Sequence, residues 1–154
     1  VQVGDAVGGY QESKFFEPGT DVVVAKTPFG NIGLMVCYDL RFPELALTLR
    51  ARGANILTAP AAFTYTTGQM HWQLLLQARA MDSQSIVLGA AQQGWHGEKR
   101  QTWGHAAATN SRGQVLDLIL NPGAQLITVP FDLAEQVQIR ESMPLMQHRK
   151  LVQF

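Results

Sequence analysis

Cys37 is the one residue of this chain that offers a thiol, and it lies in the stretch GLMVCYDLRFPEL, residues 33–45. An apolar run ends at this cysteine, and charged residues and Pro43 follow it. A thiol on a turn between a strand and a helix can act as a nucleophile, because backbone N–H groups at such a turn stabilise a thiolate and a developing oxyanion. The backbone amide of Tyr38 is the nearest candidate donor. Free cysteine is also among the most buried residue types, so simple packing is the alternative.

Other residue types that could do chemistry give weaker signals. The four histidines show no paired spacing typical of zinc, and one cysteine supplies no second thiolate, so the sequence predicts no metal site. A Cys–His–Asn nucleophile could be written with Cys37, His105 and Asn110. Any chain of this length offers such a trio by chance, and we give it little weight.

The elements that must position Cys37 alternate between strands and helices. Apolar and β-branched runs predict strands at residues 21–26, 31–36, 54–59, 85–91 and 124–133, and two more around the Ser-Arg-Gly turn at 111–113. Helices are predicted at residues 43–52, 70–81 and 134–142, while residues 1–13 and 92–104 are expected to be loops. This order predicts an α/β protein with a sheet covered by helices. Ligands in such folds bind beyond the carboxyl ends of strands, where Cys37 and the loops starting at Pro60 and Gln92 are expected.

Composition limits the function classes. A length of 154 residues fits a single domain, residues 1–154, and 46% hydrophobic content is ordinary for a globular protein. The net charge is zero, which argues against a nucleic-acid partner, and no apolar run is long enough for a membrane span. A lone cysteine cannot form an internal disulfide, so a cytoplasmic location is expected. The chain starts at Val1 in the middle of a pattern, and we therefore expect the C-terminal portion of something longer.

Several separate motifs resemble the nitrilase superfamily, also called the carbon–nitrogen hydrolases. They are YQESKFFEPG, CYDLRFPE, TGQMHWQLLLQARAMDSQ, EKRQTWGHA, SRGQVL and MQHRK, in the same order along nearly the whole chain. The resemblance implies an α-β-β-α sandwich, here incomplete because the N-terminal part is missing, and usually a homodimer. It also implies hydrolysis of non-peptide carbon–nitrogen bonds by glutamate, lysine and cysteine, with no metal or other cofactor. The substrate would be a small-molecule amide.

The resemblance assigns roles to particular residues. Cys37 matches the nucleophile that forms a thioester, Tyr38 the oxyanion donor through its backbone N–H, and Glu12 a second glutamate that positions lysine and substrate. Without the resemblance, Glu12 reads as a solvated loop carboxylate. The family's catalytic lysine and its general-base glutamate belong to segments that would precede Val1, and none of this chain's lysines matches that lysine. This chain alone is therefore expected to be inactive.

Within the superfamily, AAQQGWHGEKRQTWGHA and PLMQHRK most resemble the branch that hydrolyses deaminated glutathione to 2-oxoglutarate and cysteinylglycine. The alternatives are an ω-amidase acting on 2-oxoglutaramate and a non-catalytic remnant that serves as a dimerisation module. Deaminated glutathione and 2-oxoglutaramate are both anionic, so Lys99 and Arg100 are candidates to bind a substrate carboxylate. An equally weighted alternative is that these residues form a solvated surface cluster. Phe63, Thr66 and Thr67, on a second strand-end loop, are expected to line the pocket. His71 and Trp72 are expected to brace it, and the helices at 43–52 and 67–84 and the tail at 143–154 to contact a partner copy.

Overall fold

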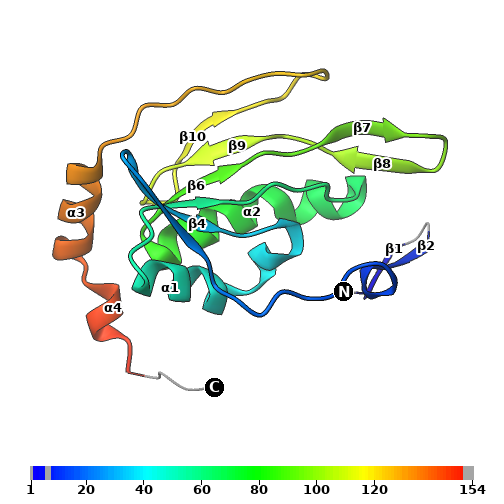
Figure 1. Cartoon of the computed structure of the whole chain (residues 1–154). Helices are drawn as coiled ribbons and strands as arrows, with labels where there is room; N and C mark the ends of the chain where they lie inside the picture. Colours follow the sequence, from blue (N-terminus) through cyan, green and yellow to red (C-terminus); the bar gives the residue numbers. More distant parts are fainter. Residues whose placement is uncertain (1, 6–7, 151–154) are drawn as a thin grey trace.

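A mixed sheet is the centre of the fold (Figure 1). In the computed structural model, which describes residues 2–5 and 8–150, six strands pair in the order β10-β9-β6-β5-β4-β3. Their bounds are β3 Val24–Thr27, β4 Gly30–Leu34, β5 Ile56–Thr58, β6 Ile86–Gly89, β9 Ala107–Thr109 and β10 Val115–Leu118. The neighbours β4, β5 and β6 are parallel, and the other pairs are antiparallel. The carboxyl ends of β4, β5 and β6 therefore lie along one edge.

Two helices connect the parallel strands and cover one face of the sheet (Figure 1). Helix α1 spans Pro43–Ala51 and α2 spans Tyr65–Ser83. Pro43 suits the first helical turn, where its missing N–H costs nothing. Gly53, at φ +94°, supplies the left-handed backbone that follows the end of α1. The crossovers fold each helix back on its own strands, as parallel pairing requires.

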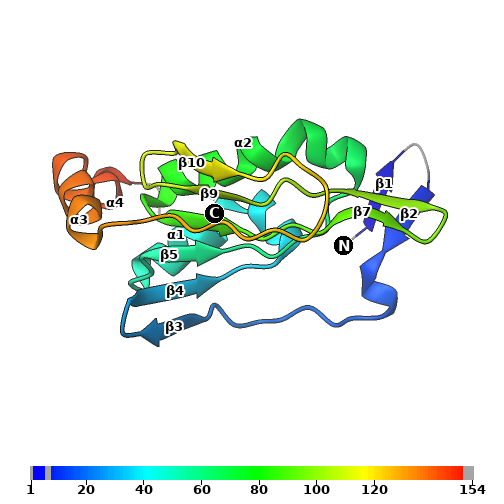
Figure 2. The same cartoon turned by 90° about the horizontal axis from the view of Figure 1, so that it is seen from above.

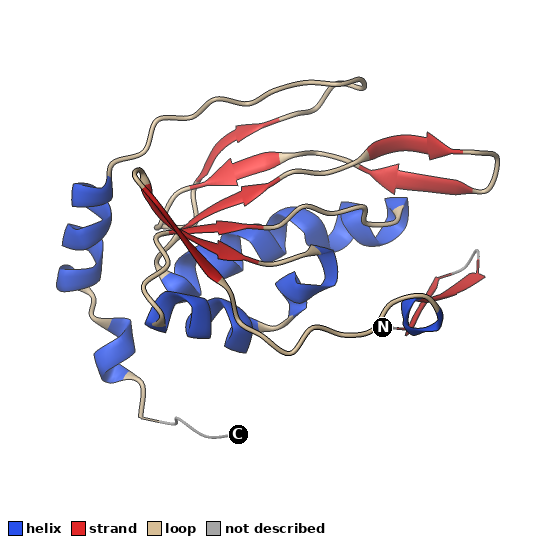
Figure 3. Cartoon of the chain, in the orientation of Figure 1, coloured by secondary structure: helices blue, strands red, loops and turns tan. Residues whose placement is uncertain are grey.

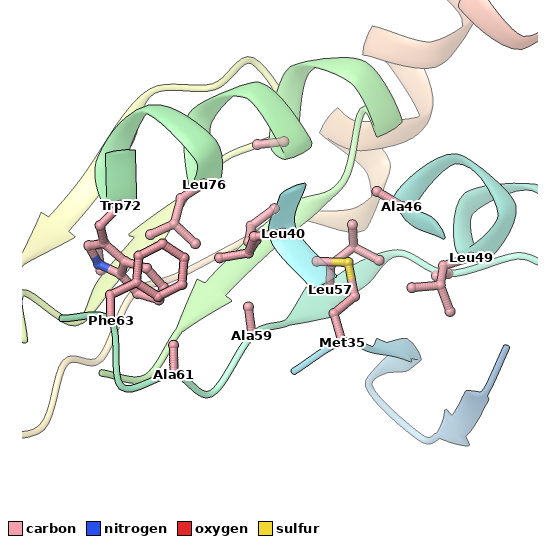
Figure 4. Packing of buried hydrophobic residues seen from close by; sticks show 14 residues of the cluster. Met35, Leu40, Ala46, Leu49, Leu57, Ala59, Ala61, Phe63, Trp72 and Leu76 are labelled. Atoms are coloured by element: carbon pink, nitrogen blue, oxygen red, sulfur yellow. The ribbon is translucent and has the colours of Figure 1, made fainter. Parts of the chain in front are cut away.

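The hydrophobic core lies between these helices and the sheet (Figure 4). Leu49 of α1 and Leu76 of α2 are fully buried, as is Leu57 of β5. The helix 70–81 is confirmed, but three residues of the apolar stripe that predicted it face solvent, whereas Leu75 of the same stripe packs against the core. The buried positions of α2 include Trp72, Leu76 and Ala80, whereas Met70, Leu74 and Met81 are 59%, 65% and 49% exposed.

The other face of the sheet has no helix over it among the described residues. Along residues 33–36, exposed and buried positions alternate. Leu34 and Val36 are 45% and 61% exposed, whereas Gly33 and Met35 are buried. Residues 121–132 pass this face as a loop, drawn without a strand in Figures 2 and 3. The strand predicted at 124–133 is therefore wrong, because no described strand lies beside it to complete a ladder. The chain supplies one helix layer and one sheet layer of the expected α-β-β-α sandwich.

Short elements complete the described chain. Helix α3, Leu133–Ser142, lies at the amino ends of the parallel strands, where Gln136 bonds Asn55 and Arg140 bonds the carbonyls of Ala54 and Gln84. Helix α4 spans Leu145–His148. None of the described helices is long and apolar enough to cross a bilayer.

Both segments expected to be loops contain antiparallel hairpins. Strands β1, Gln2–Asp5, and β2, Gly8–Gln11, pair near the start of the chain, and the short 3₁₀ helix η1, Glu12–Lys14, follows them. Strands β7, Gln93–His96, and β8, Arg100–Trp103, pair within residues 92–104. The polar composition of these segments concealed their pairing, because a hairpin satisfies its backbone without needing a continuous apolar face.

Candidate active site

Cys37 lies on a sharp turn just past the carboxyl end of β4. It opens the 3₁₀ helix η2, Cys37–Arg41, and its φ of +48° is in the left-handed region that non-glycine residues avoid. Such a conformation costs about 1–3 kcal/mol and persists only where the surroundings fix it. The N–H of Cys37 donates to the carbonyl of Pro60 at 2.9 Å, and the N–H of Val36 donates to the Asp39 carboxylate at 2.8 Å. The turn is therefore fixed on both sides of the cysteine.

The surroundings of the thiol act on its charge in opposite directions. Burial raises the pKa of Cys37 above its usual value, and this is the largest effect. Backbone hydrogen bonds from Ala62 and Tyr38 and the positive charge of Arg100 lower the pKa of the same thiol, whereas the negative charge of Glu12 raises it. The raising effects prevail, so the sulfur is protonated at neutral pH. Two backbone N–H groups nevertheless face the position where negative charge would develop.

Three of the residues singled out from sequence thus act on the charge of the Cys37 thiol: Tyr38, Glu12 and Arg100. Arg100 begins β8, and its Nη2 also donates to the carbonyl of Ala62 at 3.4 Å. Lys99 precedes it in the exposed turn of the hairpin. Of the two candidate anchors, only Arg100 acts on the charge of the thiol.

The expected pocket-lining residues lie differently from the prediction. Phe63 is only 8% exposed and packs edge-on against Trp72, with ring centroids 5.2 Å apart. It belongs to the hydrophobic core, as does Trp72. Thr66 and Thr67 lie in the first turn of α2, not on a loop, because the helix begins at Tyr65.

Sequence reasoning missed the backbone N–H of Ala62. Its signal was its place in the loop that follows β5, a buried strand parallel to β4, since the carboxyl ends of such strands share one edge of the sheet. Backbone donors depend on position and not on side-chain type, so no residue pattern marks them.

The Cys–His–Asn trio does not assemble around the thiol. Asn110 follows β9, whose antiparallel pairing with β6 carries this end of the strand to the amino edge, opposite Cys37. Its side chain accepts from the N–H groups of Arg112 and Gln114 in a turn. His105 pairs its Nδ1 with the carbonyl of Trp103 at 2.8 Å. Within the described part of the chain, no cluster of three or more metal-ligating side chains occurs.

Comparison with known proteins gives consistent matches. The family described as carbon–nitrogen hydrolase matches residues 5–141. A deaminated glutathione amidase of Yersinia enterocolitica is 45% identical over 99% of this chain and 53% of its own length. The human protein of that name is 47% identical over 80% of this chain and 38% of its own. The chain thus spans about half the length, or less, of the curated relatives it matches.

Solved structures agree with the sequence matches. The NitFhit protein of Caenorhabditis elegans superposes with a TM-score of 0.86 and 37% identity, over 97% of this chain and 37% of that one. Nit3 of Saccharomyces cerevisiae, a member of branch 10 of the nitrilase superfamily, has a TM-score of 0.83 and 28% identity, over 96% of this chain and 56% of that one.

Proposed function

Because this chain belongs to the carbon–nitrogen hydrolase family, we propose that it carries the nucleophile of an amidase, with Cys37 as that nucleophile. The observation that supports this most is the convergence of the Ala62 and Tyr38 backbone donors and the Arg100 charge on a thiol at a strand-end turn. A buried structural cysteine needs neither donors nor a cation directed at its sulfur.

The proposed reaction has two halves. The Cys37 thiolate attacks the amide carbonyl carbon, and the resulting oxyanion accepts hydrogen bonds from backbone N–H groups of the turn. The carbon–nitrogen bond then breaks, the amine leaves with a proton, and a thioester remains on Cys37. Water adds to the thioester, releasing the carboxylic acid and restoring the thiol.

The thiol needs help to ionise, because burial holds its pKa high. The lysine and the general-base glutamate that the family uses match no residue of this chain. We propose that residues outside these 154 supply them in a protein as long as the curated relatives, which we call the full-length protein. A lysine cation beside the sulfur would favour the thiolate, and a carboxylate would accept its proton. Glu12 is proposed to position that lysine and the substrate.

The proposed substrate is deaminated glutathione, cleaved to 2-oxoglutarate and cysteinylglycine. The relatives named deaminated glutathione amidase, from Yersinia enterocolitica and human, are 45% and 47% identical to the chain over the matched residues. Arg100 is proposed to hold a substrate carboxylate, because it is a cation at the same strand edge as the nucleophile. Lys99, Thr66 and Thr67 would then contribute at the rim of the site.

The functional assembly is proposed to be a homo-oligomer of at least two copies. Helix α2 presents Met70 and Leu74 to solvent one helical turn apart, with Met81 further along the helix. Exposed apolar side chains gathered on one helix are a common feature of protein–protein contacts.

The test introduces Cys37→Ala and Cys37→Ser into the full-length protein and compares both variants with the unaltered full-length protein. The assay measures release of 2-oxoglutarate from deaminated glutathione. Both variants should lose turnover, and mass spectrometry of the unaltered protein at short times should detect the thioester adduct. Persistent turnover in Cys37→Ala would refute the nucleophile role. Preference for 2-oxoglutaramate would identify an ω-amidase. The 154-residue chain alone should show no turnover above background, and robust turnover would mean that the base or lysine has been misassigned.

A further inference from the structure

Arg41 joins three segments beside the candidate nucleophile. Its guanidinium carbon lies 5.3 Å from the centroid of the Tyr38 ring and 5.5 Å from that of Phe63. Its Nη2 lies 3.3 Å from Nδ1 of His71, which must accept because a guanidinium can only donate. One side chain thus contacts η2, the loop between β5 and α2, and α2 itself.

The two aromatic partners of Arg41 belong to the segments that carry the thiol's backbone donors. Tyr38 is itself one donor, and Phe63 directly follows Ala62, the other. The segments come from different strands, so the distance between the two donors depends on how η2 and the β5–α2 loop are held together. The cation over both rings is a direct link between them.

The loop is already fixed on its other side. Trp72, 1% exposed, packs edge-on against the Phe63 ring, and its Nε1 donates to the carbonyl of His105 at 2.6 Å. The backbone N–H of Trp103 donates to the carbonyl of Phe63 at 3.0 Å. The turn at Cys37 has a backbone conformation that needs such constraint. The hydrogen bond from the N–H of Cys37 to the carbonyl of Pro60 already connects this turn to the loop, and Arg41 adds a side-chain connection through Tyr38 and Phe63.

We propose that Arg41 is a positioning residue that holds η2 and the β5–α2 loop at the separation at which the N–H groups of Tyr38 and Ala62 both reach the sulfur of Cys37. This inference rests on the proposed role of Cys37 as nucleophile. It is distinct from direct charge stabilisation: the charged groups that act on the thiol are Glu12 and Arg100.

The test measures alkylation of Cys37 by iodoacetamide across pH in the folded chain, for Arg41→Met, Arg41→Lys and His71→Phe. The matched control is Arg112→Met, which removes an exposed arginine paired with Glu135 at 3.9 Å. Losing one hydrogen bond to the thiolate should raise the apparent pKa of Cys37 in Arg41→Met by about one unit, making alkylation near neutral pH about tenfold slower. The rate at high pH, where every thiol is ionised, should change little.

The conservative variants separate position from charge. Arg41→Lys keeps the cation but loses the planar group that spans both rings, so it should resemble Arg41→Met. His71→Phe removes only the third contact and should give a smaller shift in the same direction. If Arg41→Met does not fold, the other two variants carry the same measurement. A pH profile matching that of Arg112→Met, or faster alkylation, overturns the proposal.

A second readout separates this inference from the proposed function. In the full-length protein, Arg41→Met should lower kcat with KM little changed, because the backbone N–H groups act on charge that develops in the transition state. If Cys37→Ala abolishes turnover while Arg41→Met keeps full kcat, the positioning role fails alone. If Cys37→Ala stays active, the nucleophile role fails, whatever the alkylation profile shows.

Discussion

Gly68→Ala should destabilise this protein, although the same change stabilises most helices. Gly68 lies in the first part of α2, where alanine is ordinarily favoured over glycine by about 1 kcal/mol. A Cβ at this position would lie 2.2 Å from Cβ of Trp103 and 2.6 Å from its Cγ. Ordinary contact begins near 3.4 Å, so helix and hairpin would have to separate by about 1.2 Å.

That separation has little room to occur. Trp103 stacks on His105 at a centroid distance of 3.9 Å and packs edge-on against Tyr65 at 5.0 Å. Overpacking costs about 1–3 kcal/mol, and a clash with three atoms of one indole side chain belongs to the upper part of that range, about 2–3 kcal/mol. Subtracting the gain of about 1 kcal/mol in helix propensity leaves a net loss of about 1–2 kcal/mol. Urea unfolding followed by circular dichroism should show a midpoint lowered by roughly 0.5–1 M, given an m-value of about 2 kcal/mol/M.

The same displacement should reach the candidate active site. Trp103 ends the strand that Arg100 begins, so moving the hairpin withdraws a positive charge from Cys37, and alkylation of the thiol should slow near neutral pH. Gln69→Ala, at the exposed next position of α2, is the matched control and should change neither property. A Gly68→Ala variant as stable as the unaltered chain would refute the packing argument, because it would mean that the hairpin moves freely.

Three further outcomes are expected. Because burial raises the pKa of Cys37, iodoacetamide should label the folded chain more slowly than the urea-unfolded chain at neutral pH. The difference in labelling rate should vanish as pH rises through the folded-state pKa, and equal rates at neutral pH would contradict this prediction. In the full-length protein, Arg100→Glu should lower kcat/KM for every amide, because the Arg100 charge favours the Cys37 thiolate. The loss should be about ten- to a hundredfold larger for deaminated glutathione than for short neutral amides, and this extra loss should appear mainly in KM. An unchanged ratio of kcat/KM between the two substrates would contradict a role for Arg100 in holding a substrate carboxylate. Light scattering of the full-length protein should show at least a dimer. Leu74→Glu should shift it toward the monomer, because Leu74 is 65% exposed between Met70 and Met81. A monomer without the substitution would mean that these residues form no interface.

Local sequence patterns predicted most of the elements around the core. The strands that became β4, β5 and β6 are short apolar runs, and α1 is bounded by Pro43 and Gly53. These signals depend on side chains within one element, so no knowledge of the neighbours is needed. The apolar run at 124–133 failed for the converse reason: a strand exists only with a hydrogen-bonded neighbour, and none of the described strands lies beside it.

The sequence by itself determined that Cys37 follows a strand and begins a turn, and its motifs identified the family. Only the tertiary structure decided which groups face the sulfur. Ala62, Arg100 and Glu12 come from three separate segments, and no local pattern relates them to Cys37. Ala62 and Arg100 follow β5 and β6 along the chain, and parallel pairing of β4, β5 and β6 places the carboxyl ends of these strands on one edge. Glu12 precedes β3, whose antiparallel pairing with β4 brings the amino end of β3 to the same edge. Tertiary structure also decided which face of α2 is buried. The spacing of its apolar residues predicts a helix, but packing against the sheet buries Trp72 and leaves Leu74 exposed.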